Sequence, residues 1–193
     1  TALPPFDSAR HDGTPHDDAP HDDAPHDDAP HDDAPHDDAP HRLDATRDSA
    51  RRDVLDWLRA GPGILVYSGH GSLPVLGDEK LLTVEDAGAW QGPTIVMAWT
   101  CLCANFTHPS QLGLSEAWLR DRRGVVAVVG PTGETTTVQQ SPMALAFQRA
   151  VVDGATLGDA LLAGWASAQS ADVRAGFLLL GDPALQPFPA DGR

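Results

Sequence analysis

The sequence predicts an α/β fold in which helices cover both faces of a mostly parallel β-sheet. Short apolar runs, of which Val125–Val129 is the purest, are rich in β-branched residues. They lack the apolar–polar alternation of half-exposed strands, as expected where both faces of a strand are buried. Segments of helical periodicity separate these runs, and such alternation is typical of a parallel sheet covered on both sides.

The first globular element is expected to be a helix over residues 46–60, because its apolar side chains recur at the spacing of one helix face. These side chains are Ala50, Val54, Trp57 and Leu58. Gly61-Pro62-Gly63 ends this helix. Further along the chain, we expect strands at 64–68, 94–100, 125–129 and 177–180, and helices at 115–123, 142–153 and 156–169.

Residues 11–41 form a low-complexity array of a different character. The unit His-Asp-Asp-Ala-Pro repeats five times from His16 to Pro40, after one variant unit. Proline at every fifth position excludes a continuous helix, and alanine alone cannot bury enough apolar surface to offset the ordering entropy. We therefore interpret residues 1–44 as a disordered repeat linker and residues 45–193 as the globular domain. Weak binding of divalent metal by the repeat remains an alternative.

The charge of the chain belongs mainly to this linker. Residues 1–44 hold thirteen Asp and two Arg, a net charge of −11. The whole chain carries −15, so residues 45–193 carry only −4. No basic cluster could follow a phosphate backbone, and no apolar run reaches the roughly 18–20 residues that span a bilayer. We expect neither a nucleic-acid partner nor a membrane span.

Two reactive side chains follow two of the expected strands. Strand 64–68 leads into Gly69-His70-Gly71-Ser72, and strand 94–100 leads into Cys101. Since ligand sites of parallel sheets lie beyond the carboxyl ends of strands, both side chains are expected at one sheet edge. A histidine beside a cysteine raises its thiolate fraction or accepts its proton. The Gly71 and Cys101 N–H groups are then candidate oxyanion donors, and this chemistry needs no cofactor.

Several motifs together resemble the gingipain-type cysteine peptidases, relatives of caspases and legumain. Ser68–Ser72 and Thr100–Phe106 resemble the two active-site segments of that family. Further matches between Asp48 and Phe188 are Ser115–Leu119, Gly124–Gly130, Thr132–Thr135, Ser141–Met143 and Gly181–Leu185. The resemblance implies a caspase-like three-layer α/β/α sandwich. It also implies a cysteine endopeptidase that hydrolyses polypeptides through a thioester, with Cys101 as nucleophile and His70 as general base.

The resemblance extends to the substrate pocket and to the cellular location. It implies that the loop after the third strand lines the pocket, with Thr132, Gly133, Glu134 and Gln139 as its candidate residues. Gln139 stands near a position where some members have a bulky aromatic, which argues against an arginine- or lysine-selective pocket. Relatives of this type imply an extracellular or cell-surface bacterial protein.

One departure from the family pattern lies upstream. In the caspase-like fold two strands precede the one that ends in the catalytic histidine, and the repeat occupies their place here. We therefore expect residues 45–193 to be the C-terminal part of a caspase-like domain that lacks its first strands, within a parent chain that has further domains. The strand at 64–68 would then carry an unpaired edge.

Two other functions remain open. One is a non-catalytic caspase-like interaction or regulatory module. The other is a metal-binding domain in which Cys101, Cys103, His108 and His70 act as ligands. The C-x-C-x4-H spacing is not a standard zinc pattern, so we expect no metal site. We expect Cys103 to be a packing residue and His108 to lie in a surface loop.

Overall fold

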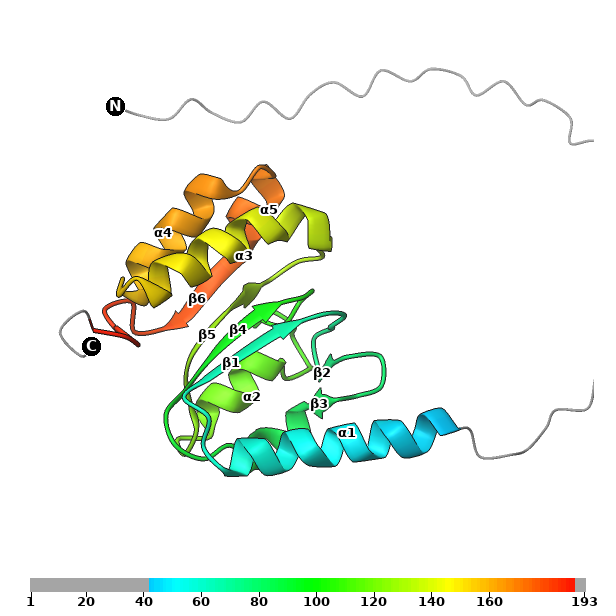
Figure 1. Ribbon diagram of the computed structural model, residues 1–193. Helices are drawn as coiled ribbons and strands as arrows, with labels where there is room; N and C mark the ends of the chain where they lie inside the picture. The colour runs from blue at the N-terminus through cyan, green and yellow to red at the C-terminus, as the bar shows by residue number, and fades with distance from the viewer. Residues whose placement is uncertain (1–41, 190–193) are drawn as a thin grey trace, which may run out of the picture. The chain divides into compact units, whose positions relative to one another are not determined.

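The computed structural model of this chain describes residues 42–189, with side chains from Arg47 onward, and its centre is a four-stranded sheet (Figure 1). The strands are β1 (Ile64–Ser68), β4 (Thr94–Trp99), β5 (Val125–Pro131) and β6 (Phe177–Gly181), in the spatial order β1-β4-β5-β6. The first three are parallel, and β6 is antiparallel to β5. The predicted α/β class with a mostly parallel sheet is confirmed.

Helices cover both faces of this sheet, which gives three layers (Figure 1). The helices are α1 (Arg42–Arg59), α2 (Leu114–Arg120), α3 (Thr137–Val152), α4 (Leu157–Ser167) and α5 (Ala171–Gly176). The helices α3, α4 and α5 contribute to the apolar cluster on one face, and α1 and α2 to the cluster on the other. The caspase-like α/β/α sandwich that the sequence resemblance implies is therefore confirmed.

The central strand β4 explains why its sequence is apolar at nearly every position. All six of its residues are buried. Ile95, Met97 and Trp99 pack into the cluster beneath α3 and α4. The residues between them, Val96 and Ala98, pack into the cluster beneath α1 and α2. Because successive side chains of a strand point to opposite faces, two covered faces require the continuous apolar run seen here.

Most predicted elements occur within a few residues of their expected bounds, and the largest difference lies at α3. The expected start was residue 142, whereas the helix begins at Thr137. Thr136 caps it: its hydroxyl accepts the Gln139 N–H at 3.3 Å, and the Gln139 side chain accepts the Thr136 N–H at 3.1 Å. This capping box fixes the helix start ahead of Pro142.

Three short elements between β1 and β4 were not predicted. They are β2 (Val75–Leu76), β3 (Leu82–Thr83) and the 3₁₀ helix η1 (Val84–Ala89). Arg51 of α1 holds this region in place. Its guanidinium donates to the carbonyls of Lys80 at 2.9 Å and Leu81 at 3.1 Å, and pairs with the Asp86 carboxylate at 2.8 Å. The small hairpin is thus tied to α1.

The strand β1 forms one edge of the sheet in residues 42–189, where it pairs only with β4. Its Val66 side chain is 49% exposed. The predicted linker lies mainly outside the described residues, and the predicted absence of upstream strands stays a prediction. Within the described range, none of the helices combines the length and apolar character needed to cross a bilayer.

Candidate active site

The parallel pairing of β1 with β4 brings the two reactive segments to one edge of the sheet. Ser68 is the register partner of Trp99, and the ladder continues with a 3.3 Å hydrogen bond from the Gly69 N–H to the Trp99 carbonyl. His70 and Cys101 each lie two residues beyond this last matched pair. Both residues therefore follow the carboxyl ends of neighbouring parallel strands, at one edge of the sheet.

Gly71 provides the direct contact between the two segments. A Cβ built at Gly71 would lie 2.3 Å from the Thr100 Oγ1 and 3.2 Å from the Cys101 carbonyl oxygen. The backbone of Gly71 therefore packs against Thr100 and Cys101 at a separation that only glycine permits. Thr100 itself is fully buried, and its hydroxyl has no hydrogen-bond partner in the described part of the chain.

The backbone around Gly71 leaves its N–H group unused. Gly71 forms an isolated antiparallel bridge with Leu76, whose two hydrogen bonds come from the flanking residues. Ser72 donates to the Val75 carbonyl at 2.9 Å, and Gly77 donates to the His70 carbonyl at 2.8 Å. Among the described residues neither the Gly71 N–H nor the Cys101 N–H meets an acceptor. Both of the N–H groups predicted as oxyanion donors are thus unpaired here.

The His70 side chain is exposed, while its main-chain carbonyl is held by two donors. The first is the Gly77 N–H, and the second is the Tyr67 hydroxyl, which donates at 2.6 Å. Burial and the nearby carboxylates of Glu79 and Asp78 raise the pKa of Tyr67 above its usual value. The Tyr67 phenol therefore stays protonated and remains a donor at neutral pH.

The Cys101 side chain is half-buried and contacts the loop after β5. Its thiol donates to the Thr135 carbonyl at 3.2 Å, and the Thr135 N–H approaches the sulfur at 3.4 Å. The next residue, Leu102, has a φ of 57° and donates its N–H to the Gly133 carbonyl at 3.1 Å. Within residues 47–189, no hydrogen bond joins the sulfur to His70. The Cys101 thiol thus contacts the loop after β5, which the sequence predicts to line the substrate pocket.

Cys103 and Cys101 have different environments, although only one residue separates them. Cys103 is completely buried in the cluster beneath α1 and α2. Burial raises the pKa of its thiol to about 12, so the thiol stays protonated and unreactive at neutral pH. Cys103 is therefore a packing residue, and Cys101 is the more accessible of the two cysteines.

The alternative metal site gains no geometric support in the described residues. His108 is exposed, and its Nδ1 accepts the main-chain N–H groups of Ser110 and Gln111 at 3.4 and 3.0 Å. Nowhere in this part of the chain do three His, Cys, Asp or Glu side chains converge on one point.

The four predicted pocket residues have two kinds of surroundings. Thr132 donates its hydroxyl to the Gly176 carbonyl at 3.0 Å, and the Gln139 side chain caps α3. Glu134 is exposed, and a Cβ at Gly133 would meet no atom within 4 Å. The open part of this loop thus lies around Gly133 and Glu134. It is close to Cys101, because the Gly133 carbonyl accepts the N–H of Leu102, the residue after Cys101.

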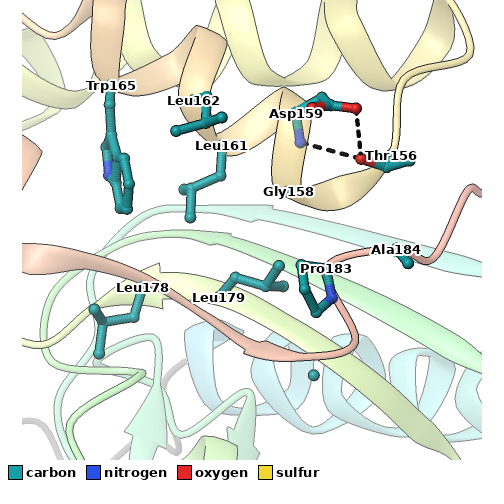
Figure 2. Close-up of a pocket in the computed structure, with 11 residues that line it drawn as sticks. Thr156, Gly158, Asp159, Leu161, Leu162, Trp165, Leu178, Leu179, Pro183 and Ala184 are labelled. Atoms are coloured by element: carbon teal, nitrogen blue, oxygen red, sulfur yellow. Dashed lines mark hydrogen bonds between the residues drawn. The ribbon is translucent and has the colours of Figure 1, made fainter.

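A separate apolar groove of about 680 Å³ lies between α4 and the end of β6. Figure 2 shows Leu161 and Trp165 of α4 projecting toward Leu178 and Leu179 of β6. The Thr156 hydroxyl caps α4 near one end of the groove. None of the predicted catalytic or pocket residues lines it.

The structure adds two residues, Tyr67 and Thr100, to which sequence reasoning gave no role. It also shows that Thr135, which lies in the predicted pocket loop, contacts Cys101. Tyr67 is the only tyrosine of the chain and precedes His70 by three residues, a signal that the sequence offers. The backbone contacts of Thr135 with Cys101 join residues 34 positions apart, and no local pattern indicates them.

A three-layer α/β/α domain with a cysteine and a histidine after adjacent parallel strands defines the caspase-like class of fold. The sequence profile of peptidase family C25 matches residues 26–188 of this chain. The chain therefore belongs to peptidase family C25, the gingipain family. A search of curated proteins found no match.

Solved structures of similar fold include cysteine proteinases of this family. A structure of a protease matches with a TM-score of 0.62 and 17% identity, over 70% of this chain and 37% of that one. The Arg-specific cysteine proteinase gingipain R (RgpB) matches with a TM-score of 0.59 and 18% identity, over 70% and 36%. The complex of Porphyromonas gingivalis RgpB pro- and mature domains matches with a TM-score of 0.61 and 15% identity, over 70% and 36%. The matched region thus spans little more than a third of these structures.

Proposed function

We propose that this chain carries the catalytic residues of a cysteine endopeptidase, with Cys101 as the nucleophile and His70 as the general base. In this proposal residues 45–193 form the peptidase part and residues 1–44 the linker. The substrate is a polypeptide, and an extracellular or cell-surface bacterial location follows from the family alone.

One observation carries this proposal: the register that pairs Ser68 with Trp99. His70 and Cys101 both follow the carboxyl ends of these adjacent parallel strands, where α/β proteins bind their ligands. The contact of Gly71 with Thr100 and Cys101 supports the same juxtaposition. The burial of Cys103 removes the only competing thiol in the chain.

The reaction follows from the chemistry of these two side chains. The thiol leaves the Thr135 carbonyl and passes its proton to His70, and the thiolate attacks the scissile carbonyl carbon. The carbon–nitrogen bond then breaks, and His70 returns the proton to the leaving amine. Water, deprotonated by His70, attacks the thioester, which releases the new carboxyl group and regenerates the Cys101 thiol.

The negative charge that develops on the oxygen of the attacked carbonyl needs hydrogen-bond donors near Cys101. The unpaired N–H groups of Gly71 and Cys101 serve as the oxyanion donors in this proposal. The substrate side chain next to the scissile bond lies over the open part of the loop at Gly133 and Glu134. Thr132 and Gln139 support this pocket through their bonds to Gly176 and Thr136.

Covalent labelling tests the proposal. The chain is treated with biotinylated peptidyl acyloxymethyl ketones that carry Arg, Lys, Asn or Asp next to the ketone, and the adduct is mapped by mass spectrometry. We expect a single adduct on Cys101, none on Cys103, and none in the Cys101→Ala variant. The reagent that reacts fastest identifies the preferred side chain. No adduct with any reagent, or equal slow labelling of both cysteines, would favour a non-catalytic caspase-like module.

A further inference from the structure

The His70–Gly71 peptide is held by a group that the proposed mechanism does not use. The carbonyl half of this peptide accepts two hydrogen bonds, from the Tyr67 hydroxyl at 2.6 Å and from the Gly77 N–H at 2.8 Å. A carbonyl oxygen has two lone pairs, so these two bonds complete its capacity. The donors come from two different elements, the strand β1 and the turn between β2 and β3.

Because a peptide unit is planar, the two hydrogen bonds to the His70 carbonyl also determine the direction of the Gly71 N–H. The six atoms of a trans peptide lie in one plane, with the carbonyl and the following N–H pointing in opposite directions. No described peptide bond is cis. The two donors that fix the direction of the His70 carbonyl therefore also fix the direction of the Gly71 N–H. That N–H meets no acceptor within the described chain, and Gly71 packs against Cys101.

The backbone of Gly69 and the apolar cluster beneath α1 and α2 both hold the Tyr67 ring in place. A Cβ at Gly69 would lie 2.8 Å from the Tyr67 hydroxyl oxygen, so the phenol lies directly over the Gly69 backbone. The Tyr67 ring also packs against the apolar cluster beneath α1 and α2. A packed ring loses little further entropy when its hydroxyl binds a carbonyl, which makes it a rigid donor.

We propose that Tyr67 is a positioning residue whose hydroxyl orients the Gly71 N–H toward the oxyanion of the acylation step, an inference that rests on the proposed peptidase function. Tyr67 does not touch the substrate in this account. It acts through one peptide plane, and its contribution is confined to reactions in which an oxyanion forms at the attacked carbon.

This restriction separates Tyr67 from a residue that merely supports the fold. Acylation of Cys101 by p-nitrophenyl acetate passes through a tetrahedral oxyanion, with p-nitrophenolate as the leaving group. Alkylation by iodoacetamide displaces iodide at a saturated carbon and forms no oxyanion. A loss of oxyanion stabilisation slows the first reaction and leaves the second unchanged.

The experiment compares both second-order rate constants at Cys101 in four forms of the chain: the wild type, Tyr67→Phe, Thr94→Val and His70→Ala. Tyr67→Phe removes only the hydroxyl. Thr94→Val is the matched control, because the Thr94 hydroxyl also donates to a main-chain carbonyl, that of Pro62, at the opposite end of the sheet. We expect Tyr67→Phe to slow acylation by about tenfold, the scale of one hydrogen bond, and to change alkylation less than twofold. Thr94→Val should change neither rate by more than about twofold.

The possible results have distinct meanings. If Tyr67→Phe slows both reactions equally, or slows neither, the positioning role is overturned while the peptidase proposal stands. If His70→Ala leaves both rates unchanged, the Cys101–His70 dyad is wrong and the role of Tyr67 falls with it. A selective loss of acylation in Tyr67→Phe, together with slower reactions of both kinds in His70→Ala, supports the two proposals together.

Discussion

Gly71→Ala is expected to lower the rate of Cys101 labelling by peptidyl ketones about a hundredfold, the scale of an ångström-sized misplacement in an active site. The added Cβ would lie 2.3 Å from the Thr100 Oγ1 and 3.2 Å from the Cys101 carbonyl oxygen. Because Thr100 is fully buried in a packed interior, we expect the His70–Gly71 segment to move away from Cys101 instead. The measurement is the second-order labelling rate of Cys101.

Two further variants separate this steric effect from a general effect of removing a glycine. Gly63→Ala is the matched control, since a Cβ there meets no atom within 4 Å, and it should label at the wild-type rate. Thr100→Ala removes the nearest clashing atom, so the pair Gly71→Ala with Thr100→Ala should regain part of the lost rate. Equal losses in Gly63→Ala and Gly71→Ala, or wild-type labelling of Gly71→Ala, would contradict the contact between the two segments.

Trp118→Ala is expected to reduce the free energy of unfolding by about 3–5 kcal/mol. Trp118 lies on α2, and its side chain is completely buried. Its ring contacts that of Trp90 edge to face, with ring centroids 5.3 Å apart. Its removal leaves a cavity in the cluster that joins α2 to η1 and the sheet. Urea unfolding followed by circular dichroism measures the change.

Trp57→Ala is the control for this prediction. Trp57 lies on α1 and is 44% exposed, so its loss should cost less than about 1.5 kcal/mol. Equal destabilisation by the two variants would mean that the cluster beneath α1 and α2 does not hold this layer of the domain together.

The sequence indicates the sheet well where strands are buried on both faces. The run in β4 and the β-branched run in β5 predict their strands closely, because continuous apolar segments bounded by polar residues have few alternatives. The antiparallel direction of β6, in contrast, cannot be predicted from the local sequence. Three helices, α3, α4 and α5, connect β5 to β6 and return the chain to the edge where β5 ends. Strand direction depends on this tertiary path, which local periodicity does not report.

The short elements escape prediction for a related reason. The strands β2 and β3 have two residues each, too few for a period to be recognised. Their position depends on Arg51, about thirty residues upstream, through its bonds to Lys80, Leu81 and Asp86. The hairpin nevertheless matters for the site, because its Gly77 N–H holds the His70 carbonyl.

In the candidate site, too, the residues set by local sequence are predictable and those set by tertiary contacts are not. His70 and Cys101 are predictable because each follows a strand directly, and parallel strands share an edge. Thr135 and Thr100 are not, since their contacts with Cys101 and Gly71 arise only when distant segments fold together. The different burial of Cys101 and Cys103 also needs the structure, and it is burial that raises the pKa of the Cys103 thiol.

The dependence of Cys101 reactivity on His70 tests the central claim most directly. The labelling rate of Cys101 with the best peptidyl acyloxymethyl ketone is measured at neutral pH in the wild type, His70→Ala and His108→Ala. His108 is an exposed histidine whose ring accepts hydrogen bonds from its own loop, at Ser110 and Gln111, which makes it the matched control. We predict a loss of at least about a hundredfold in His70→Ala, the scale of a missing general base, and a wild-type rate in His108→Ala. Equal rates in all three proteins would contradict the Cys101–His70 dyad.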